Sequence, residues 1–193
     1  MALSGRVPAS AVAGEALLTA FFLLEPRLRR GEPARSLSAD AGDRGSTRAL
    51  AAATLVAGAG APALGLPAGA RLPARDGWAG VCLMGGGLAL RVVSARRLGA
   101  HYTRTLRVSA DQAVVDSGPY RFVRHPGYAG VLLLWLGYGL AWTRPSTVAV
   151  TILPTAVAYA RRIAAEEALL GERLGDAYRD YRRRTARLVP GVF

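Results

Sequence analysis

The sequence of 193 residues contains no lysine and no asparagine, and it has one cysteine and two histidines. These few side chains exclude a disulfide framework and a zinc site made only of cysteine and histidine, so we expect no bound metal. Acidic residues are also scarce, with 13 against 25 arginines and a formal net charge of +12. Because 51% of the residues are hydrophobic, the composition fits a membrane protein with basic flanks or a nucleic-acid-binding protein.

Long stretches without charge favour the membrane protein. Residues 49–70 and 145–160 carry no charge, and residues 125–143 carry no formal charge. A helix that spans a bilayer needs about 20 mostly apolar residues. We therefore predict an all-α polytopic membrane protein with about five spans, and residues 1–193 as a single integral membrane domain. The spans are expected near residues 8–24, 49–69, 77–96, 127–143 and 145–162.

The arginines divide unevenly between the segments that connect these spans. Twenty lie in residues 25–48, 96–124 and 161–193, which would share one side of the membrane, and four lie on the other side. The positive-inside rule then puts the N-terminus outside and the C-terminus in the cytoplasm, as in a bacterial inner membrane. A nucleic-acid-binding protein would gather its arginines on one face, so we expect no nucleic-acid partner.

Two charged residues lie inside the predicted spans and away from their ends. Glu15 lies in the first span and Arg91 in the third. Charged groups within spans seek partners, so the two side chains could pair with each other. We prefer a second interpretation, in which Arg91 extends to the cytoplasmic face of the membrane.

Small residues predict where the spans pack together. Ala57, Ala61 and Gly65 recur every four residues in the second span, and Gly85–Gly87 form a glycine run in the third. Such residues let helix backbones approach closely in lipid. Only residues 144–145 separate the fourth and fifth spans, which predicts a tight helical hairpin.

The pattern after the fifth span predicts a cytoplasmic amphipathic helix. Its stripe consists of one acidic and four largely apolar residues at helical spacing, namely Ile163, Glu167, Leu170, Leu174 and Tyr181.

Two motifs in the C-terminal half carry the chemical signal. Arg124-His-Pro-Gly-Tyr128 stands at the start of the fourth span, and Arg162-Ile-Ala-Ala-Glu-Glu167 follows the hairpin. Their order and spacing resemble the isoprenylcysteine carboxyl methyltransferase family and its relatives among membrane phospholipid methyltransferases, here as a short, bacterial-type member. The resemblance covers residues 96–193. Residues 1–95 share only the spans and the loop Asp43-Arg-Gly-Ser46, which is similar to bacterial relatives.

The resemblance implies S-adenosylmethionine as the cofactor, held by residues 96–193 at the cytoplasmic membrane face without a Rossmann fold. It implies that Arg162 binds the methyl acceptor, with Arg124 and Glu167 as further candidates. Ala164 and Ala165 replace two acidic residues of the family. Carried over position by position, the implied cofactor contacts are Gln112, Ala113, Val114, Val115, Tyr120, His125, Pro126, Gly127, Tyr128 and Glu166.

Elementary chemistry is consistent with these roles. Aromatic faces such as Tyr120 or Tyr128 stabilise a sulfonium by about 0.5–2 kcal/mol each. A carboxylate acceptor needs no general base, and Arg162 could hold it with two parallel hydrogen bonds. We therefore predict carboxyl methylation of a prenylated cysteine or another lipid carboxylate, in contact with membrane lipids, with residues 1–95 shaping the acceptor site.

Several alternatives remain open at this point. Arg162 and Glu166 could simply pair across one helical turn, and His125 could merely cap the fourth span. The methyl group could go to a nitrogen, sulfur or hydroxyl of another lipid. A non-catalytic membrane scaffold with the same fold is the alternative outside the enzymes.

Overall fold

The computed structural model of the chain describes residues 7–28, 43–66, 70–99, 102 and 114–191. These described residues form five long helices: α1 (Ala9–Leu28), α3 (Ser46–Gly65), α4 (Ala74–Leu98), α5 (Pro126–Ala141) and α6 (Pro145–Arg184). A short 3-10 helix, η3 (Gly118–Arg121), precedes α5. Within these ranges the single β-type pairing is a bridge between Val123 and Ala186, so the all-α prediction is confirmed.

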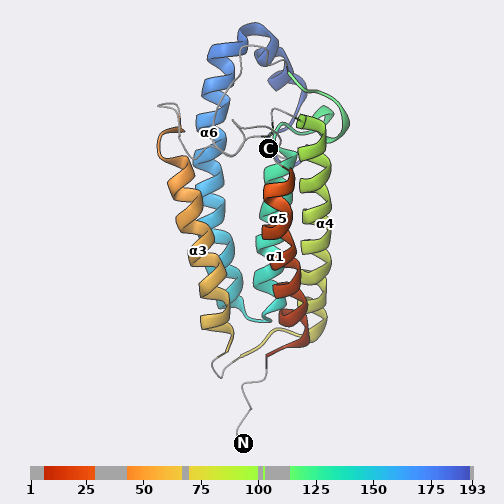
Figure 1. Ribbon diagram of the computed structural model, residues 1–193, viewed down its shortest axis with the longest axis vertical. Coiled ribbons are helices and arrows are strands. Elements are labelled where there is room, and N and C mark those ends of the chain that lie inside the picture. Colours follow the sequence, from red (N-terminus) through yellow and green to blue (C-terminus); the bar gives the residue numbers. More distant parts are fainter. Residues whose placement is uncertain (1–6, 29–42, 67–69, 100–101, 103–113, 192–193) are drawn as a thin grey trace, which may run out of the picture.

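The helices lie side by side along the long axis of the molecule (Figure 1). α4 packs on α5, α3 packs on α6, and α1 covers α4 and α5. In the described part of the chain α1, α3, α4 and α6 are long and apolar enough to cross a membrane. α5 is equally apolar but has 16 residues, which is short for a complete span. The five predicted spans therefore correspond to five helices, four of which have the full spanning length.

The predicted hairpin between α5 and α6 is confirmed. Residues 142–144 make the turn, in which Thr143 has a positive φ of 56°. Arg144 is buried there, and its Nε donates to the carbonyl of Gly65 at the end of α3 over 3.1 Å. The hairpin is therefore tied to α3 as well as closed on itself.

Glycines bring the backbones of α4 and α5 into contact at two levels. A Cβ added to Gly80 would lie 2.5 Å from the carbonyl oxygen of Gly137, and one added to Gly130 would lie 2.5 Å from that of Gly87. Neither Gly85 nor Gly86 has a neighbour within 4 Å of such an atom. The glycine run therefore contributes one contact residue rather than three, because only one side of α4 faces α5.

α6 continues well beyond the apolar segment. It reaches Arg184, with one break at Gly175, whose φ and ψ are 54° and −127°. After this break the chain turns back toward the bundle (Figure 1). Ile163 and Glu167 are buried along the predicted stripe before the break, and Tyr181 is buried after it, so the predicted extension is helical on both sides of Gly175.

Both interpretations of Arg91 are wrong. The side chain is buried, and its Nη2 lies 2.8 Å from Oε1 of Glu25 at the end of α1. The hydroxyl of Tyr102 donates to the same oxygen over 2.6 Å. Glu15 instead accepts the hydroxyl of Tyr138 over 2.5 Å. Glu25 lies level with Arg91 in the folded bundle, and a buried guanidinium takes the carboxylate that stands at its own height.

Candidate active site

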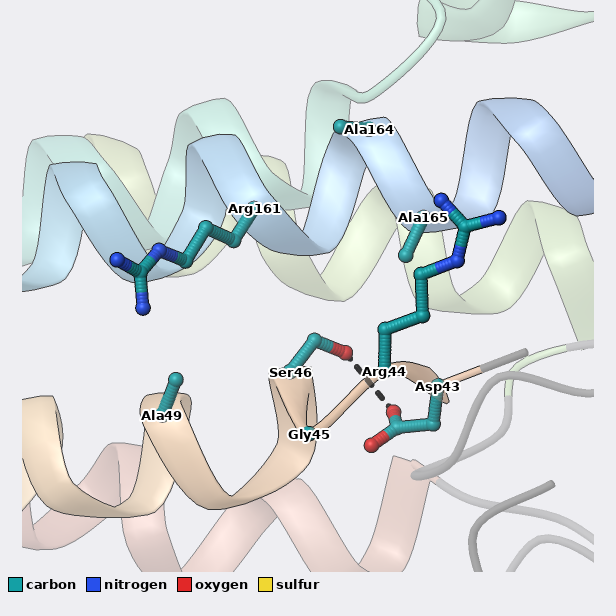
Figure 2. A pocket seen from close by; sticks show the side chains of 8 residues that line it. All are labelled: Asp43, Arg44, Gly45, Ser46, Ala49, Arg161, Ala164 and Ala165. Carbon is teal, nitrogen blue, oxygen red and sulfur yellow. Dashed lines mark hydrogen bonds between the residues drawn. The ribbon is translucent and has the colours of Figure 1, made fainter. Parts of the chain in front are cut away.

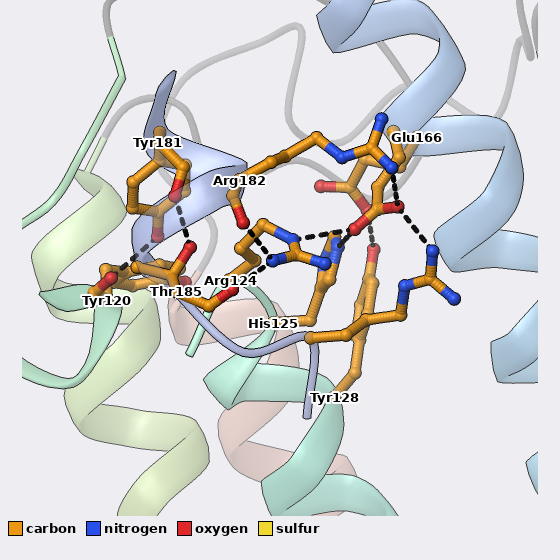
Figure 3. Close-up of polar contacts among 10 residues, drawn as sticks. Tyr120, Arg124, His125, Tyr128, Glu166, Tyr181, Arg182 and Thr185 are labelled. Atoms are coloured by element: carbon orange, nitrogen blue, oxygen red, sulfur yellow. Dashed lines mark hydrogen bonds and ion pairs between the residues drawn. The ribbon is translucent and has the colours of Figure 1, made fainter. Parts of the chain in front are cut away.

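The sequence-assigned side chains come from segments at the end of the bundle opposite the α5–α6 hairpin (Figure 1), and Figure 3 shows Tyr120, His125, Tyr128 and Glu166 close together. Tyr120 comes from η3, His125 and Tyr128 from the start of α5, and Arg162 and Glu166 from α6. α5 begins at Pro126, whose fixed φ suits a first helical position. That start presents His125 and Tyr128 to α6.

Tyr128 is the centre of this group. Its hydroxyl donates to Oε2 of Glu166 over 2.5 Å, and Nε of Arg162 donates to the hydroxyl oxygen over 3.4 Å. Its ring stacks on His125, with centroids 5.5 Å apart and planes 4° apart. Tyr159 packs against the same ring at 5.1 Å. The arrangement places aromatic faces beside a half-buried carboxylate.

His125 is the N-cap residue of α5, as the alternative interpretation held, but its side chain does not cap the helix. Its carbonyl accepts the first helical hydrogen bonds, but its ring makes no capping bond. The buried Nε2 lies 3.3 Å from Oε1 of Glu167 instead. The same contact orients the ring over Tyr128.

Glu167 and Arg124, the further candidates, bind each other in a buried cluster. Nε of Arg124 donates to Oε1 of Glu167 over 2.9 Å, and Nη2 of Arg187 donates to Oε2 over 3.0 Å. Arg182 approaches the second oxygen at 3.8 Å. Arg124 also donates to the carbonyl of Thr185. The carboxylate therefore fastens the C-terminal segment to the start of α5.

This C-terminal segment is a part of the site that sequence reasoning missed. Backbone bonds join Arg124 N to the Ala186 carbonyl over 2.8 Å and His125 N to the Arg187 carbonyl over 3.1 Å. The hydroxyl of Tyr181 donates to the carbonyl of Tyr120 over 2.7 Å. The arginine-rich composition of the C-terminal segment did not predict these contacts, because arginines are equally common on a solvated surface.

The structure describes some of the remaining assigned residues. Gly127 is buried against Arg91, whose Nη1 would lie 3.2 Å from an added Cβ. Val114 and Val115 are half-buried, whereas Gln112 and Ala113 lie outside the described residues. Burial, reinforced by the charge of Glu166, raises the pKa of Tyr120 far above its ordinary value. Its hydroxyl therefore keeps its proton across the physiological range.

Arg162 is held by residues from the N-terminal half of the chain. Its Nη1 donates to Oδ1 of Asp43 over 2.8 Å, to Oγ of Ser46 over 3.1 Å and to Oγ1 of Thr47 over 3.2 Å. The guanidinium is almost fully buried. Sequence reasoning missed Asp43 as an Arg162 partner, although it belongs to the Asp-Arg-Gly-Ser loop already noted as similar to bacterial relatives.

Beside this ion pair a pocket of about 350 Å³ opens between the start of α3 and α6 (Figure 2). Two exposed arginines, Arg44 and Arg161, stand on opposite sides of it. Ala164 and Ala165, where the resemblance implied acidic residues, form part of its wall. The residues that line the pocket are Asp43, Arg44, Gly45, Ser46, Ala49, Arg161, Ala164 and Ala165.

Comparison with known proteins assigns the family. The family model described as phospholipid methyltransferase matches residues 76–177. The chain therefore belongs to the phospholipid methyltransferase family, and the resemblance inferred from its motifs is confirmed. It is an all-helical integral membrane protein of this family.

Curated relatives and a solved structure agree with this assignment. A probable protein-S-isoprenylcysteine O-methyltransferase of Oryza sativa is 28% identical over 55% of this chain and 56% of its own length. The corresponding enzyme of Dictyostelium discoideum is 25% identical over 60% of this chain and 49% of its own length. The chain thus spans about half the length of these relatives.

A solved structure of the eukaryotic intramembrane Ras methyltransferase, isoprenylcysteine carboxyl methyltransferase, has a similar fold. The superposition includes 100% of this chain and 55% of that protein. The TM-score is 0.56 at 19% identity, which establishes a shared fold.

Proposed function

We propose that this protein is an S-adenosylmethionine-dependent methyltransferase that methylates the carboxylate of a lipophilic acceptor. The observation that carries the proposal is the contact of Tyr128 with Glu166, framed by the rings of His125 and Tyr159. The relatives named protein-S-isoprenylcysteine O-methyltransferase support a prenylated cysteine as the acceptor. The acceptor then keeps its tail in lipid while its carboxylate reaches the site.

The described residues fit such a cofactor. A sulfonium is a soft cation, which aromatic faces and a nearby carboxylate stabilise. Tyr178 adds a hydroxyl that is buried without a hydrogen-bond partner among the described residues. A buried hydroxyl without a partner is costly, and a polar ligand would satisfy it. Glu166, Tyr128, His125 and Tyr178 would thus hold the donor.

When bound, the cofactor supplies an electrophilic methyl group. The residues of this chain contribute orientation and a dry environment, because a carboxylate is already a nucleophile and requires no base. Arg162 would orient the acceptor through its guanidinium. Tyr128, which contacts both Arg162 and Glu166, would set the distance between acceptor and donor.

The pocket between α3 and α6 supports the placement of the acceptor. One of its walls comes from residues 43–49 in the N-terminal half, so residues 1–95 would shape the acceptor site and residues 96–193 the donor site. Arg44 and Arg161 give it a positive potential suited to an anionic headgroup. We also propose that this end faces the cytoplasm of a bacterial inner membrane, because arginines are concentrated there.

Calorimetry with S-adenosylhomocysteine in detergent tests the donor site. We expect His125→Ala and Glu166→Gln each to weaken binding at least about tenfold, or about 1.4 kcal/mol, since each removes a contact in a partly dry site. Glu172→Gln is the matched control, because Glu172 is exposed on the same helix. If the folded wild-type protein binds no S-adenosylhomocysteine, the result would favour the alternative of a non-catalytic membrane scaffold.

Methyl transfer from labelled cofactor to a panel of lipids tests the acceptor. The panel contains a farnesylated cysteine analogue, a fatty acid, an amino-headgroup phospholipid and a lipophilic thiol. Arg162→Lys should reduce transfer to a carboxylate nearly as much as Arg162→Ala, because an ammonium cannot replace the planar guanidinium. Methylation confined to the phospholipid amine, or to the thiol, would assign the alternative acceptor.

A further inference from the structure

Asp43 lies directly before α3, outside the residues that the family model matches. It is almost fully buried, and both of its carboxylate oxygens accept hydrogen bonds. Oδ1 accepts the hydroxyls of Ser46 and Thr47 over 2.8 Å each, and Oδ2 accepts the backbone N–H of Thr47 over 3.2 Å. Oδ1 also accepts Nη1 of Arg162 over 2.8 Å. The bonds from Ser46 and Thr47 thus fix the position of Asp43 independently of its contact with Arg162.

A continuous chain of hydrogen bonds leads from Asp43 to the donor site. Arg162 binds Asp43 through Nη1 and Tyr128 through Nε, and Tyr128 in turn donates to Glu166. The first member comes from the N-terminal half and the last from the extension of α6. The orientation of the guanidinium is therefore decided by a carboxylate 119 residues away in sequence.

We propose that Asp43 is a positioning residue for methyl transfer, which holds the guanidinium of Arg162 against Tyr128 in the orientation that receives the acceptor. This role rests on the proposed function. Arg162 stands one helical turn from Glu166, and side chains four residues apart on a helix face each other. Without Asp43 the buried guanidinium would turn toward Glu166, the carboxylate one turn along its own helix, and the acceptor would lose its partner.

A double-mutant cycle tests this dependence. We compare wild type, Asp43→Asn, Arg162→Gln and the double variant, with the farnesylated cysteine analogue as acceptor. Asp43→Asn should lower kcat/KM at least about tenfold, since small misplacements of a reacting group cost this much or more. The dissociation constant for S-adenosylhomocysteine should change by less than about threefold. The double variant should be no less active than Arg162→Gln alone, because Asp43 acts through Arg162.

Three further variants separate positioning from general stability. Asp43→Glu keeps the charge and should recover part of kcat/KM. Thr47→Val removes one hydroxyl donor and should act in the same direction with a smaller effect, which keeps the test usable if Asp43→Asn does not fold. Asp116→Asn is the matched control, since it removes a carboxylate paired with Arg184 on the surface. It should leave every parameter unchanged.

Each outcome decides a different question. Full activity in folded Asp43→Asn protein would overturn the positioning role of Asp43 but leave the proposed function intact. The same holds if the losses of kcat/KM in the two single variants add in the double variant. Wild-type protein that binds S-adenosylhomocysteine but methylates no acceptor would overturn the proposed function, and the positioning role with it.

Discussion

The spanning part of the bundle and its site end are held together in different ways. In the spanning part, glycines such as Gly80 and Gly137 let backbones touch, and buried threonines such as Thr147 bond to nearby helix carbonyls. At the site end three buried carboxylates, Glu25, Asp43 and Glu167, each pair with an arginine. These three pairs join residues between 43 and 119 positions apart.

The difference reflects the two surroundings. Lipid provides no hydrophobic drive between helices, so close backbone packing is what favours their association. At the membrane edge, the desolvation cost of burying a charge is offset only when that charge is paired with an opposite one. We therefore expect the spanning part to respond to added volume and the site end to respond to removed charge.

The largest effect should come from Glu167→Gln. This change leaves Arg124, Arg182, Arg187 and His125 around a neutral side chain, and breaking a buried pair costs about 3–5 kcal/mol. We expect a large fall in the thermal unfolding temperature in detergent, together with loss of S-adenosylhomocysteine binding. Glu166→Gln should lower binding alone. Equal stability of Glu167→Gln and wild type would show that the C-terminal segment does not depend on this cluster.

A smaller effect should follow from added volume between α4 and α5. Gly137→Ala places a methyl group against the backbone of Gly80 and should destabilise the protein by about 1–3 kcal/mol. Gly86→Ala is the matched control, because an added Cβ there meets nothing within 4 Å. It should be neutral or should stabilise α4 by up to about 1 kcal/mol through helix propensity. Similar unfolding temperatures for the two variants would refute the proposed close contact.

The smallest effect should be a pH dependence at Asp43. Burial raises its pKa, but bonds from Ser46 and Thr47 and the charge of Arg162 together lower it below the ordinary value. A carboxyl group with a lowered folded-state pKa stabilises the fold above its unfolded pKa and loses that contribution as the pH falls. As the pH falls through the acidic range, the free energy of unfolding should therefore decrease less steeply in Asp43→Asn than in wild type. Parallel curves would contradict this.

The amino-acid sequence by itself determined the helices, the hairpin and most of the residues that meet at the site. Apolar length is a local property that a bilayer requires, so the spans predicted near residues 8–24 and 49–69 correspond to α1 and α3. His125 lies at the start of α5, and Glu166 lies in the middle of α6 at a similar distance along the chain from the turn that joins the two helices, so their proximity followed from the hairpin. α6 was predictable as a helix, although its break at Gly175 was not.

Only the tertiary structure decided which charges meet. The partner of Arg91 is Glu25 rather than Glu15, and the partner of Arg162 is Asp43 rather than a carboxylate on its own helix. A hydropathy pattern states how long a helix is, but it does not state how far that helix is rotated about its axis or how high it stands beside its neighbours. A buried ion pair depends on both, because two charges must lie within about 4 Å of each other to offset the loss of their hydration.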